Sequence, residues 1–324
     1  MKPTIVFWGS YGEDALLQLH ALLDDRFNCV ELAADQCDYD LLKTAVCILL
    51  RGPKMPADVL DACAGELKLI QRWGAGYDGI DSKHAAELGI YVSIAAGVNS
   101  NAVAELTLAL LLTVYRNIVP LHQSTLAGGW ERQRYLERSF EIQGKTAGLV
   151  GCGHIGRLVA KKLGALGAQV IYYDPYRLPE AVEQEFGLEY VDMDHLLARA
   201  DIVSLHLPAL DSTKGMVNRE FLRKMKPTAV LLNAARGSLV NEADLNEALR
   251  SGQILGAGLD SLAVEPPLPD NPLLTCPNLV ITPHVGGTSA DVSNTMATRV
   301  ADNMIRFCDG LPLPKGDLVA GPGL

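Results

Sequence analysis

The sequence predicts an α/β protein made of two doubly wound parallel-sheet domains. Three observations support this prediction. The 324 residues exceed the size of one ordinary domain. Short β-prone runs alternate with helix-like segments, and this alternation stops and restarts around a Gly- and charge-rich stretch at residues 127–144. Because small ligands usually bind in clefts between domains, we expect a ligand there.

The first series of alternating segments runs from residue 4 to about residue 93. Each β-prone run is followed by a helix-like segment, which is the pattern of βα units on a parallel sheet. The expected strand and helix pairs are 4–8 with 13–23, 46–50 with 57–64, and 67–71 with 82–88. These units predict a first open α/β domain.

A longer helix is expected at residues 102–118, because this segment is apolar on most of its faces. Asn99, Ser100 and Asn101 are its candidate N-caps. We expect this helix to be buried between the domains. Its most apolar part, residues 106–114, is too short to span a bilayer as a helix.

The second series predicts a sheet of six strands, separated by helical patterns such as residues 242–250. The β-prone runs are 146–150, 169–173, 202–205, 229–233, 256–259 and 279–282. The last segment, 289–309, is amphipathic and helical, and we expect it to return to the first domain. The predicted division is therefore residues 1–99 and 286–324 in one domain, with residues 100–285 inserted as the other.

Composition and charge restrict the class of protein. A content of 48% hydrophobic and 20% charged residues is ordinary for a globular protein, and a formal net charge of -10 argues against nonspecific nucleic-acid binding. The first residues form a β-prone run rather than a signal peptide. We expect a cytoplasmic protein with no metal site and with neither a membrane nor a nucleic acid as partner.

The cysteines include no C-x-x-C pair and fall mostly inside apolar stretches. This distribution predicts buried free thiols in a reducing compartment. The seven cysteines are Cys29, Cys37, Cys47, Cys63, Cys152, Cys276 and Cys308.

The glycine loop at residues 151–156, GCGHIG, matches G-x-G-x-x-G between a β-prone run and a helical pattern. Gly151 permits a tight turn, Gly153 lets the backbone approach a pyrophosphate, and Gly156 lets the helix pack against its strand. The helix N-terminus then offers its N–H groups to the phosphates. The loop therefore predicts a dinucleotide site.

Asp174 ends the next β-prone run. A carboxylate at this place accepts hydrogen bonds from the ribose hydroxyls and repels a 2′-phosphate, which favours NAD over NADP. Arg177 leaves an opening for NADP. A glycine turn in a domain that binds no nucleotide, with an incidental Asp174, is the structural alternative.

Three polar residues follow apolar runs in the second half, and they suit hydride transfer to a 2-oxo acid. The planar fork of Arg236 is suited to hold a carboxylate and polarise a ketone. His284 is suited to donate or accept the proton, since an imidazole in general titrates near neutrality. Glu265 would pair with His284, orient its ring and favour its protonated form. Taken alone, each also fits a structural role, as a hydrogen-bonded histidine, a solvated loop acid or a cation at a helix entry.

These segments resemble the D-isomer-specific 2-hydroxyacid dehydrogenase family, which includes phosphoglycerate dehydrogenases and glyoxylate/hydroxypyruvate reductases. In the family's order, the sequence carries the glycine loop, N-x-x-R-G at Arg236, G-x-D at Asp260 with E-P at Glu265, and T-P-H at His284. The segments QRWGAGYDGID and NSNAVAELTLALLL resemble its substrate-side loop and interdomain helix. The resemblance covers nearly the whole chain.

The resemblance implies a fold, an activity and site residues. The fold is a Rossmann NAD-binding domain inserted in a flavodoxin-like substrate domain, and the activity is reversible hydride transfer between NADH and a small 2-oxo acid. The implied catalytic residues are Arg236, Glu265 and His284, and the implied substrate-binding residues are Ala75, Gly76, Tyr77, Arg236 and His284. Asp260 is implied to lie near the nicotinamide carboxamide. The implied cofactor contacts are Gly151, Gly153, His154, Ile155, Gly156, Asp174, Leu207, Pro208, Thr213, Ala234, Ala235, Arg236, Asp260, His284, Gly286 and Gly287.

Several alternatives stay open from the sequence. Glyoxylate, hydroxypyruvate and phosphohydroxypyruvate are competing substrates; Arg51, Lys54, Arg72 and residues 130–132 are either cations for a phosphate or solvated surface charges. Formate or phosphite dehydrogenation on the same fold and an NAD-sensing corepressor-like protein are the alternative functions. The resemblance also implies a homodimer, in which residues 127–144, with Trp130, form either an interface arm or an ordinary surface loop.

Overall fold

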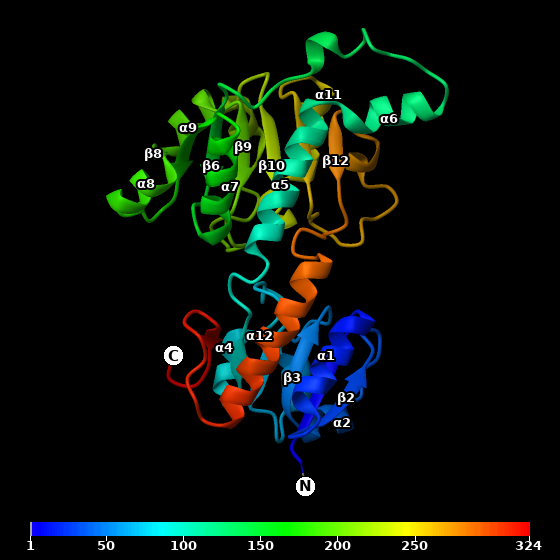
Figure 1. The fold of residues 1–324 in the computed structure, drawn as a ribbon, viewed down its shortest axis with the longest axis vertical. Helices are drawn as coiled ribbons and strands as arrows, with labels where there is room; N and C mark the ends of the chain where they lie inside the picture. The colour runs from blue at the N-terminus through cyan, green and yellow to red at the C-terminus, as the bar shows by residue number, and fades with distance from the viewer. Residues whose placement is uncertain (1) are drawn as a thin grey trace. The chain divides into compact units, whose positions relative to one another are not determined.

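The computed structural model describes residues 2–324, and these divide into two compact units. The first unit contains the residues up to Asn99 together with Gly287–Leu324, and the second unit is Ser100–Gly286. The second unit is therefore an insertion in the first (Figure 1). The chain returns to the first unit at Gly287, one residue later than the sequence predicts.

The first unit is built on a six-stranded sheet. Its strands are β1 (Thr4–Gly9), β2 (Asn28–Leu32), β3 (Ala45–Arg51), β4 (Leu69–Arg72), β5 (Tyr91–Ser93) and β13 (Leu318–Ala320). The strands from β1 to β5 are parallel in the order β2-β1-β3-β4-β5, which is the flavodoxin-like order, and β13 adds an antiparallel edge beside β5. The first sheet is thus doubly wound, as the alternating runs predict.

Helices cover both faces of this sheet. α1 (Glu13–Leu23) and α12 (Ala290–Cys308) lie side by side on one face (Figure 1). Successive strand residues point to opposite faces, so Ile5 and Phe7 of β1 pack in the core beneath α1 and α12, and Val6 and Trp8 pack in the core on the other face. That second core includes residues of α2 (Tyr39–Thr44), α3 (Ala57–Cys63) and α4 (Ser82–Glu87).

One buried carboxylate fixes the C-terminal segment to the first unit. Asp317 is fully buried and accepts hydrogen bonds from Arg299 Nε at 2.7 Å and Asn303 Nδ2 at 2.9 Å, both on α12. It also accepts from the Ala96 N–H at 3.1 Å. The carboxylate therefore joins α12, the loop after β5 and the segment that leads into β13.

The Asp317→Ala substitution is expected to destabilise the protein by ~3 kcal/mol, because the buried Asn303 amide and the partly exposed Arg299 guanidinium lose their acceptor. Urea unfolding of the purified variant measures this loss. Asp302→Asn is the matched control, because Asp302 pairs with Arg306 on a more exposed part of the same helix and such pairs contribute about 0–1 kcal/mol. Equal losses in both variants would contradict the role assigned to Asp317.

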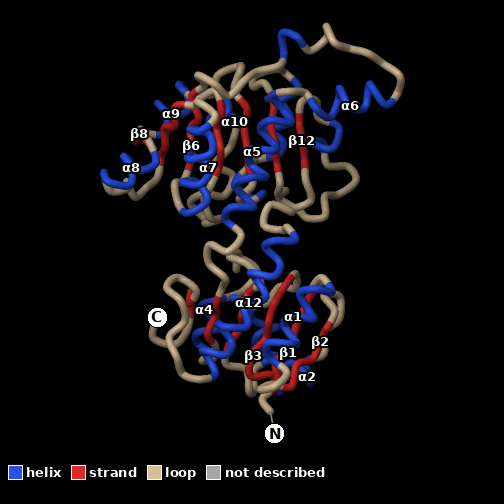
Figure 2. Tube along the Cα trace, in the orientation of Figure 1, coloured by secondary structure: helices blue, strands red, loops and turns tan. Residues whose placement is uncertain are grey.

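The second unit is built on a seven-stranded parallel sheet (Figure 2). Its strands are β6 (Thr146–Val150), β7 (Gln169–Tyr173), β8 (Leu188–Tyr190), β9 (Ile202–Leu205), β10 (Val230–Asn233), β11 (Gly256–Leu259) and β12 (Leu279–Ile281). The order β8-β7-β6-β9-β10-β11-β12 is the Rossmann order with one further strand at the end. It reverses between β6 and β9, where ligands bind in such sheets.

The second unit also has helices on both faces of its sheet, with an apolar core on each side. Its helices are α5 (Ser100–Tyr115), α6 (Ile118–Leu126), α7 (His154–Ala165), α8 (Glu180–Phe186), α9 (Met193–Arg199), α10 (Arg219–Lys224) and α11 (Glu242–Arg250). Three short 3-10 turns complete it, η1 (Leu136–Arg138), η2 (Gly237–Leu239) and η3 (Pro272–Thr275).

The long helix predicted at residues 102–118 is broken in two. α5 packs against α7 and the strands β10, β11 and β12. It ends at Tyr115, and Asn117 then takes a left-handed conformation with φ 51° before α6 begins; asparagine tolerates this conformation better than most residues. Within residues 2–324, no single helix has the length and hydropathy to cross a membrane, and α5 with α6 reaches that threshold only as a pair bent by 61°.

Four strands are absent from the sequence prediction. One of them, β5, has only three residues and lies between β4 and β13; the other three lie at sheet edges. β2, β8 and β13 are outermost strands, and each has no more than five residues. Most of their residues are only partly buried or exposed. Edge strands of this kind need no continuous apolar run, and the hydrophobic pattern that predicts central strands is therefore weak in them.

The prediction of buried thiols is wrong for two cysteines. Cys37 and Cys308 are exposed, whereas Cys47, Cys63 and Cys152 are buried. Cys37 lies in the turn between β2 and α2, and Cys308 is the last residue of α12. Both residues are therefore at places where the chain reaches the surface, one in a turn and the other at the end of a helix.

Candidate active site

The glycine loop joins β6 to α7, and its three glycines meet different requirements. Gly151 has φ 92°, and a Cβ on it would lie 2.6 Å from the His206 carbonyl oxygen. A Cβ on Gly156 would lie 2.6 Å from the Gly151 carbonyl oxygen. Gly153 has φ -70° and no atom within 4 Å of its Cβ position. Gly151 and Gly156 are therefore needed for the packing of the loop itself, whereas Gly153 leaves the backbone open to a ligand.

The loop lies where the strand order of the second sheet reverses. β6 pairs with β7 on one side and β9 on the other, and α7 begins at His154 directly after the loop. The N-cap residue is Gly153, which has no side chain to accept from the first N–H groups of α7. Such groups, together with the helix dipole, bind anions. The loop, with His154 and Ile155 in the first turn of α7, fits the phosphates of a dinucleotide.

The Asp174 carboxylate is hydrogen-bonded to the glycine loop. Asp174 follows β7 directly, and its Oδ2 accepts from the Cys152 N–H at 2.9 Å while its Oδ1 accepts from the Tyr176 N–H at 3.0 Å. Arg177 donates to both carboxylate oxygens of Glu183, at 2.9 and 3.0 Å. Asp174 therefore places a negative charge next to the loop, and Arg177 is held by a different carboxylate.

Gly151→Ala and Gly153→Ala are expected to have different effects, the first on stability and the second on NADH binding. Gly151→Ala should lower the melting temperature, because its Cβ meets the His206 carbonyl in a left-handed backbone conformation. Gly153→Ala should keep the melting temperature and weaken NADH binding, because its Cβ enters only the open side of the loop. Differential scanning fluorimetry and NADH fluorescence titration measure the two effects. Unchanged NADH affinity in Gly153→Ala would contradict the placement of the pyrophosphate.

A second loop, after β9, lies next to the glycine loop. His206 Nε2 is 3.0 Å from Ser204 Oγ, and burial lowers the pKa of His206 to about 4, so its ring is neutral at pH 7. Thr213 Oγ accepts from the Leu210 N–H at 2.9 Å and donates to the Pro208 carbonyl at 2.8 Å. The hydroxyl of Thr213 thus closes the loop that carries Leu207 and Pro208.

The loop after β10 carries Arg236 in a turn made by a buried asparagine. Asn233 is fully buried; its Nδ2 donates to the Arg236 carbonyl at 2.8 Å, and its Oδ1 accepts from the Ala235 N–H at 3.1 Å. Arg236 Nη1 donates to the Ala235 carbonyl at 2.8 Å. A Cβ on Gly237 would overlap the backbone of Leu262. The N-x-x-R-G pattern, with Ala234 and Ala235 as its middle residues, is therefore a turn packed against the next loop.

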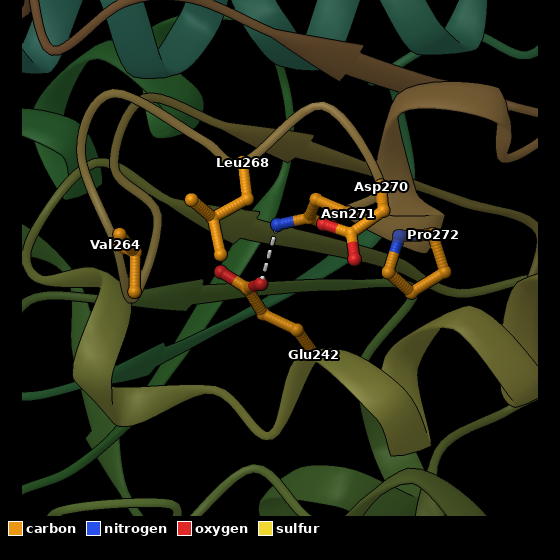
Figure 3. A pocket seen from close by; sticks show the side chains of 6 residues that line it. All are labelled: Glu242, Val264, Leu268, Asp270, Asn271 and Pro272. Carbon is orange, nitrogen blue, oxygen red and sulfur yellow. Dashed lines mark hydrogen bonds between the residues drawn. The ribbon is translucent and has the colours of Figure 1, made fainter.

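The loop after β11 is held at both ends by Glu242, the first residue of α11. Glu242 Oε1 accepts from the Ala263 N–H at 2.7 Å, and its Oε2 accepts from Asn271 Nδ2 at 2.8 Å (Figure 3). Figure 3 shows the small pocket that this loop encloses, with a volume of about 270 Å³. Its lining contains neither Glu265 nor His284, so we interpret it as packing space behind the loop. The lining residues are Glu242, Val264, Leu268, Asp270, Asn271 and Pro272.

The structure brings His284 and Glu265 together. His284 Nδ1 lies 2.8 Å from Glu265 Oε2, and Glu265 Oε1 accepts from the Leu262 N–H at 2.9 Å. The side chains are 50% and 37% exposed, so the pair is accessible from solvent. His284 has φ 54°, a left-handed conformation that is unfavourable for histidine and persists only where surrounding contacts impose it.

Asp260 imposes the conformation of the His284 loop. The residue is buried, at 2% exposure. Its Oδ1 accepts from Thr282 Oγ1 at 2.6 Å and from the Val285 N–H at 2.9 Å. Its Oδ2 accepts from the Gly286 N–H at 2.7 Å. These donors lie on both sides of His284. The sequence places Asp260 in the site by resemblance, and the structure shows that it also holds the loop.

The first unit presents a loop at residues 73–80, after β4. Arg72, the last residue of β4, donates from Nε to the Gly76 carbonyl and from Nη1 to the Leu50 carbonyl, both at 2.8 Å. Gly74 has φ 113°, which allows the chain to turn. The Arg72 guanidinium therefore shapes the loop that carries Ala75, Gly76 and Tyr77. From the sequence, Arg72 is expected only as a phosphate ligand or a surface charge.

The sequence motifs indicate the candidate reactive groups of the second unit but not the hydrogen bonds that hold their loops. Asn233, Glu242 and Thr282 each fix one of the three loops through hydrogen bonds. Asn233 is visible as the first residue of N-x-x-R-G. Thr282 is likewise visible as the first residue of T-P-H, although the motif does not reveal its bond to Asp260. Glu242 resembles any acidic residue in a first helical turn.

Comparisons with known proteins are consistent with this geometry. The family model described as D-isomer specific 2-hydroxyacid dehydrogenase, NAD binding domain, matches residues 108–286. The D-3-phosphoglycerate dehydrogenase of Archaeoglobus fulgidus is 39% identical over 260 residues, which cover 80% of this chain and 49% of that protein. The glyoxylate reductase of Korarchaeum cryptofilum is 39% identical over 268 residues, which cover 82% of this chain and 80% of that protein. The chain spans about half the length of the first relative.

A solved structure extends the likeness to the first unit. An NADPH-dependent glyoxylate/hydroxypyruvate reductase from Sinorhizobium meliloti, in complex with NADP and malonate, matches with a TM-score of 0.84 at 29% identity, over 99% of this chain and 97% of that chain. The matched family model covers more than half of the chain, including the glycine loop and the three loops around Arg236, Glu265 and His284. This chain therefore belongs to the D-isomer specific 2-hydroxyacid dehydrogenase family.

Proposed function

We propose that this protein is an NAD-dependent D-2-hydroxyacid dehydrogenase that transfers a hydride reversibly between NADH and a small 2-oxo acid. The observation that supports the proposal most directly is the 2.8 Å contact between His284 Nδ1 and Glu265 Oε2, in the unit that carries the dinucleotide loop. In this proposal the second unit binds NAD, and the first unit binds the substrate. NAD, when bound, supplies the hydride acceptor, and NADH the donor.

The His284 and Glu265 pair moves the proton. Glu265 accepts the Nδ1 proton of His284, and this bond fixes the ring so that Nε2 is available to the substrate. In the reducing direction, Nε2–H donates its proton to the ketone oxygen; in the oxidising direction, neutral Nε2 accepts the hydroxyl proton. The bond to Glu265 keeps the ring in the same orientation in both directions.

Arg236 binds and polarises the substrate in this proposal. Its guanidinium carries a charge that suits the carboxylate and the ketone oxygen of a 2-oxo acid. The backbone N–H groups of Ala75, Gly76 and Tyr77 bind the substrate carboxylate, a role that consecutive N–H groups in a turn perform elsewhere. Arg72 and Gly74 hold that loop in shape, and we assign Arg72 to positioning rather than to a substrate phosphate.

The glycine loop and Asp174 bind NAD in this proposal, with further contacts from Leu207, Pro208 and Thr213. Both oxygens of Asp174 already accept a backbone N–H, and each carboxylate oxygen has a second lone pair for a ribose hydroxyl. Ala234, Ala235, Asp260, Gly286 and Gly287 complete the proposed cofactor contacts. The preference for NAD over NADP rests on the negative charge of Asp174.

His284→Ala is expected to reduce kcat by about 10²–10⁴-fold, the contribution of a positioned acid or base. NADH affinity should change little, because the substitution leaves the glycine loop intact. Steady-state kinetics and NADH titration separate the two effects. His195→Ala is the matched control, because His195 pairs with Asp192 at 2.6 Å on the exposed helix α9. Wild-type turnover in His284→Ala would remove the mechanism.

Asp174→Asn is expected to reduce the preference for NADH over NADPH by about tenfold, which corresponds to about 1.4 kcal/mol. Asparagine keeps one oxygen as acceptor but removes the charge that repels a 2′-phosphate. The ratio of kcat/KM for the two cofactors measures the change, with Glu180→Gln as a surface-carboxylate control. An unchanged ratio would show that Asp174 does not set the preference.

A substrate panel tests the proposed reaction itself. NADH oxidation is measured with glyoxylate, hydroxypyruvate, pyruvate, phosphohydroxypyruvate and larger 2-oxo acids. Reduction of at least one member, abolished by His284→Ala, supports the proposal. Failure on every member, with NADH still bound, would contradict the proposed activity.

We also propose that the protein is a cytoplasmic homodimer. α6 and the following arm expose several large apolar side chains, which are Ile118, Val119, Leu126, Trp130 and Leu136, and aromatic residues are enriched at protein interfaces. Phe140 instead packs on Tyr115, with ring centroids 5.7 Å apart. Light scattering measures the oligomeric state, and Trp130→Glu with Leu126→Glu is expected to produce a monomer.

A further inference from the structure

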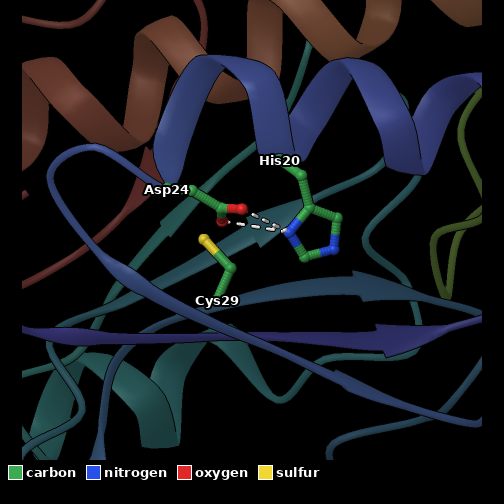
Figure 4. Close-up of side chains that lie close together, drawn as sticks. All are labelled: His20, Asp24 and Cys29. Atoms are coloured by element: carbon green, nitrogen blue, oxygen red, sulfur yellow. Dashed lines mark hydrogen bonds and ion pairs between the residues drawn. The ribbon is translucent and has the colours of Figure 1, made fainter.

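A histidine, a carboxylate and a thiol converge on the first unit, outside the proposed active site (Figure 4). His20 lies on α1, Asp24 is its C-cap residue, and Cys29 lies on β2. His20 Nδ1 is 3.0 and 3.1 Å from the two Asp24 carboxylate oxygens. The candidate ligand atoms of the three residues all lie within 4.8 Å of one another.

These ligand types and separations suit zinc. Zn²⁺ in proteins is bound by imidazole nitrogen, thiolate sulfur and carboxylate oxygen in a tetrahedral arrangement. Bond lengths of ~2.0–2.3 Å place neighbouring ligand atoms about 3.3–3.7 Å apart. The contact between His20 and Asp24 is already close to that spacing, and Cys29 Sγ requires only a small side-chain movement.

The second nitrogen of His20 has the partner that a zinc-bound histidine needs. Nε2 lies 3.1 Å from Glu31 Oε1, and Glu31 follows Cys29 on the same face of β2. A metal-bound histidine almost always donates its other ring N–H to an oxygen acceptor, which fixes the tautomer and the ring orientation. Phe7 contacts the ring edge-on, with centroids 5.4 Å apart. The imidazole is therefore held with Nδ1 directed at Asp24.

We propose that His20 Nδ1, Asp24 and Cys29 bind Zn²⁺, with water as the fourth ligand and Glu31 as the hydrogen-bond acceptor that orients His20. The site joins the end of α1 to β2. β2 begins at the amino edge of the first sheet, whereas the loop with Ala75, Gly76 and Tyr77 leaves the carboxyl edge. The metal would therefore stabilise the first unit without entering the dehydrogenase reaction.

The groups around Asp24 and Cys29 are compatible with a bound cation. Burial and the adjacent Asp24 carboxylate raise the pKa of the Cys29 thiol to about 12, so without a metal the thiol is protonated. Zn²⁺ displaces that proton to solvent as the Zn–S bond forms. The Lys2 ammonium donates to the Asp24 carbonyl at 2.6 Å, and the carboxylate of Asp24 stays available to the metal.

His84 provides a matched comparison within the same unit. Its Nε2 lies 2.8 Å from Asp61 Oδ1 and its Nδ1 lies 3.4 Å from Glu87 Oε2, so it too stands between two carboxylates. Within residues 2–324, no cysteine completes a group of three ligands around His84. The comparison therefore isolates the contribution of the thiol.

The experiment titrates the metal-free, full-length protein with Zn²⁺ against a chromogenic chelator, and with Co²⁺, in the presence of a phosphine reductant. We expect one equivalent of Zn²⁺ and a thiolate-to-cobalt charge-transfer band, both lost in Cys29→Ser and His20→Gln and retained in His84→Gln. Glu31→Gln should weaken Zn²⁺ binding by about 10–100-fold, the usual effect of removing such an acceptor. Saturating Zn²⁺ should raise the melting temperature of the wild type but not that of Cys29→Ser.

Three results would overturn the proposal: wild-type Zn²⁺ affinity in Cys29→Ser or His20→Gln, a cobalt spectrum without the thiolate band, or loss of binding in His84→Gln. Cys29 is partly buried, so melting curves without metal report whether Cys29→Ser folds. If it does not fold, Asp24→Asn replaces it, since Asp24 is an exposed ligand. Loss of binding in Asp24→Asn then supports the site, and full retention overturns it.

Discussion

The buried carboxylate of Asp260 is the constraint on which the candidate active site depends. A charged group at 2% exposure is stable only when its oxygens are fully hydrogen-bonded. Thr282, Val285 and Gly286 supply these bonds, and they lie on both sides of His284. The same bonds that satisfy the carboxylate therefore hold His284 in a left-handed conformation, from which its ring meets Glu265.

Other side chains hold neighbouring loops in the same way. Asp174 accepts backbone N–H groups of the glycine loop and of its own turn, and Glu242 accepts the Ala263 N–H in the loop that carries Glu265. The Asp174 bond to Cys152 and the Glu242 bond to Ala263 each join two segments at the carboxyl edge of the second sheet. A parallel sheet brings its loops to one edge, and these carboxylates fix the loops relative to one another. The proposed proton transfer needs this rigidity, because the pair must be in place before substrate arrives.

The two units have different relations to the proposed chemistry. The second unit contains the glycine loop and the proposed proton-transfer pair, and the family model matches residues 108–286. The first unit contributes the loop shaped by Arg72 at its carboxyl edge, and the proposed zinc site at its amino edge. Loss of zinc is therefore expected to change stability, whereas changes in residues 75–77 are expected to change substrate affinity.

The sequence by itself determined the fold class and the two-domain pattern, because central parallel strands require continuous apolar runs. It also determined the candidate residues Arg236 and His284, because their motifs follow those runs. Only the tertiary structure decided the edge strands β2, β8 and β13, the break at Asn117, and the contacts made by Asn233, Glu242 and Thr282. Only the tertiary structure places His20 near Cys29, because the fold brings the end of α1 close to β2. Hydrogen bonds between loops join residues far apart in the chain, and hydrophobic periodicity reports burial but not which polar groups meet.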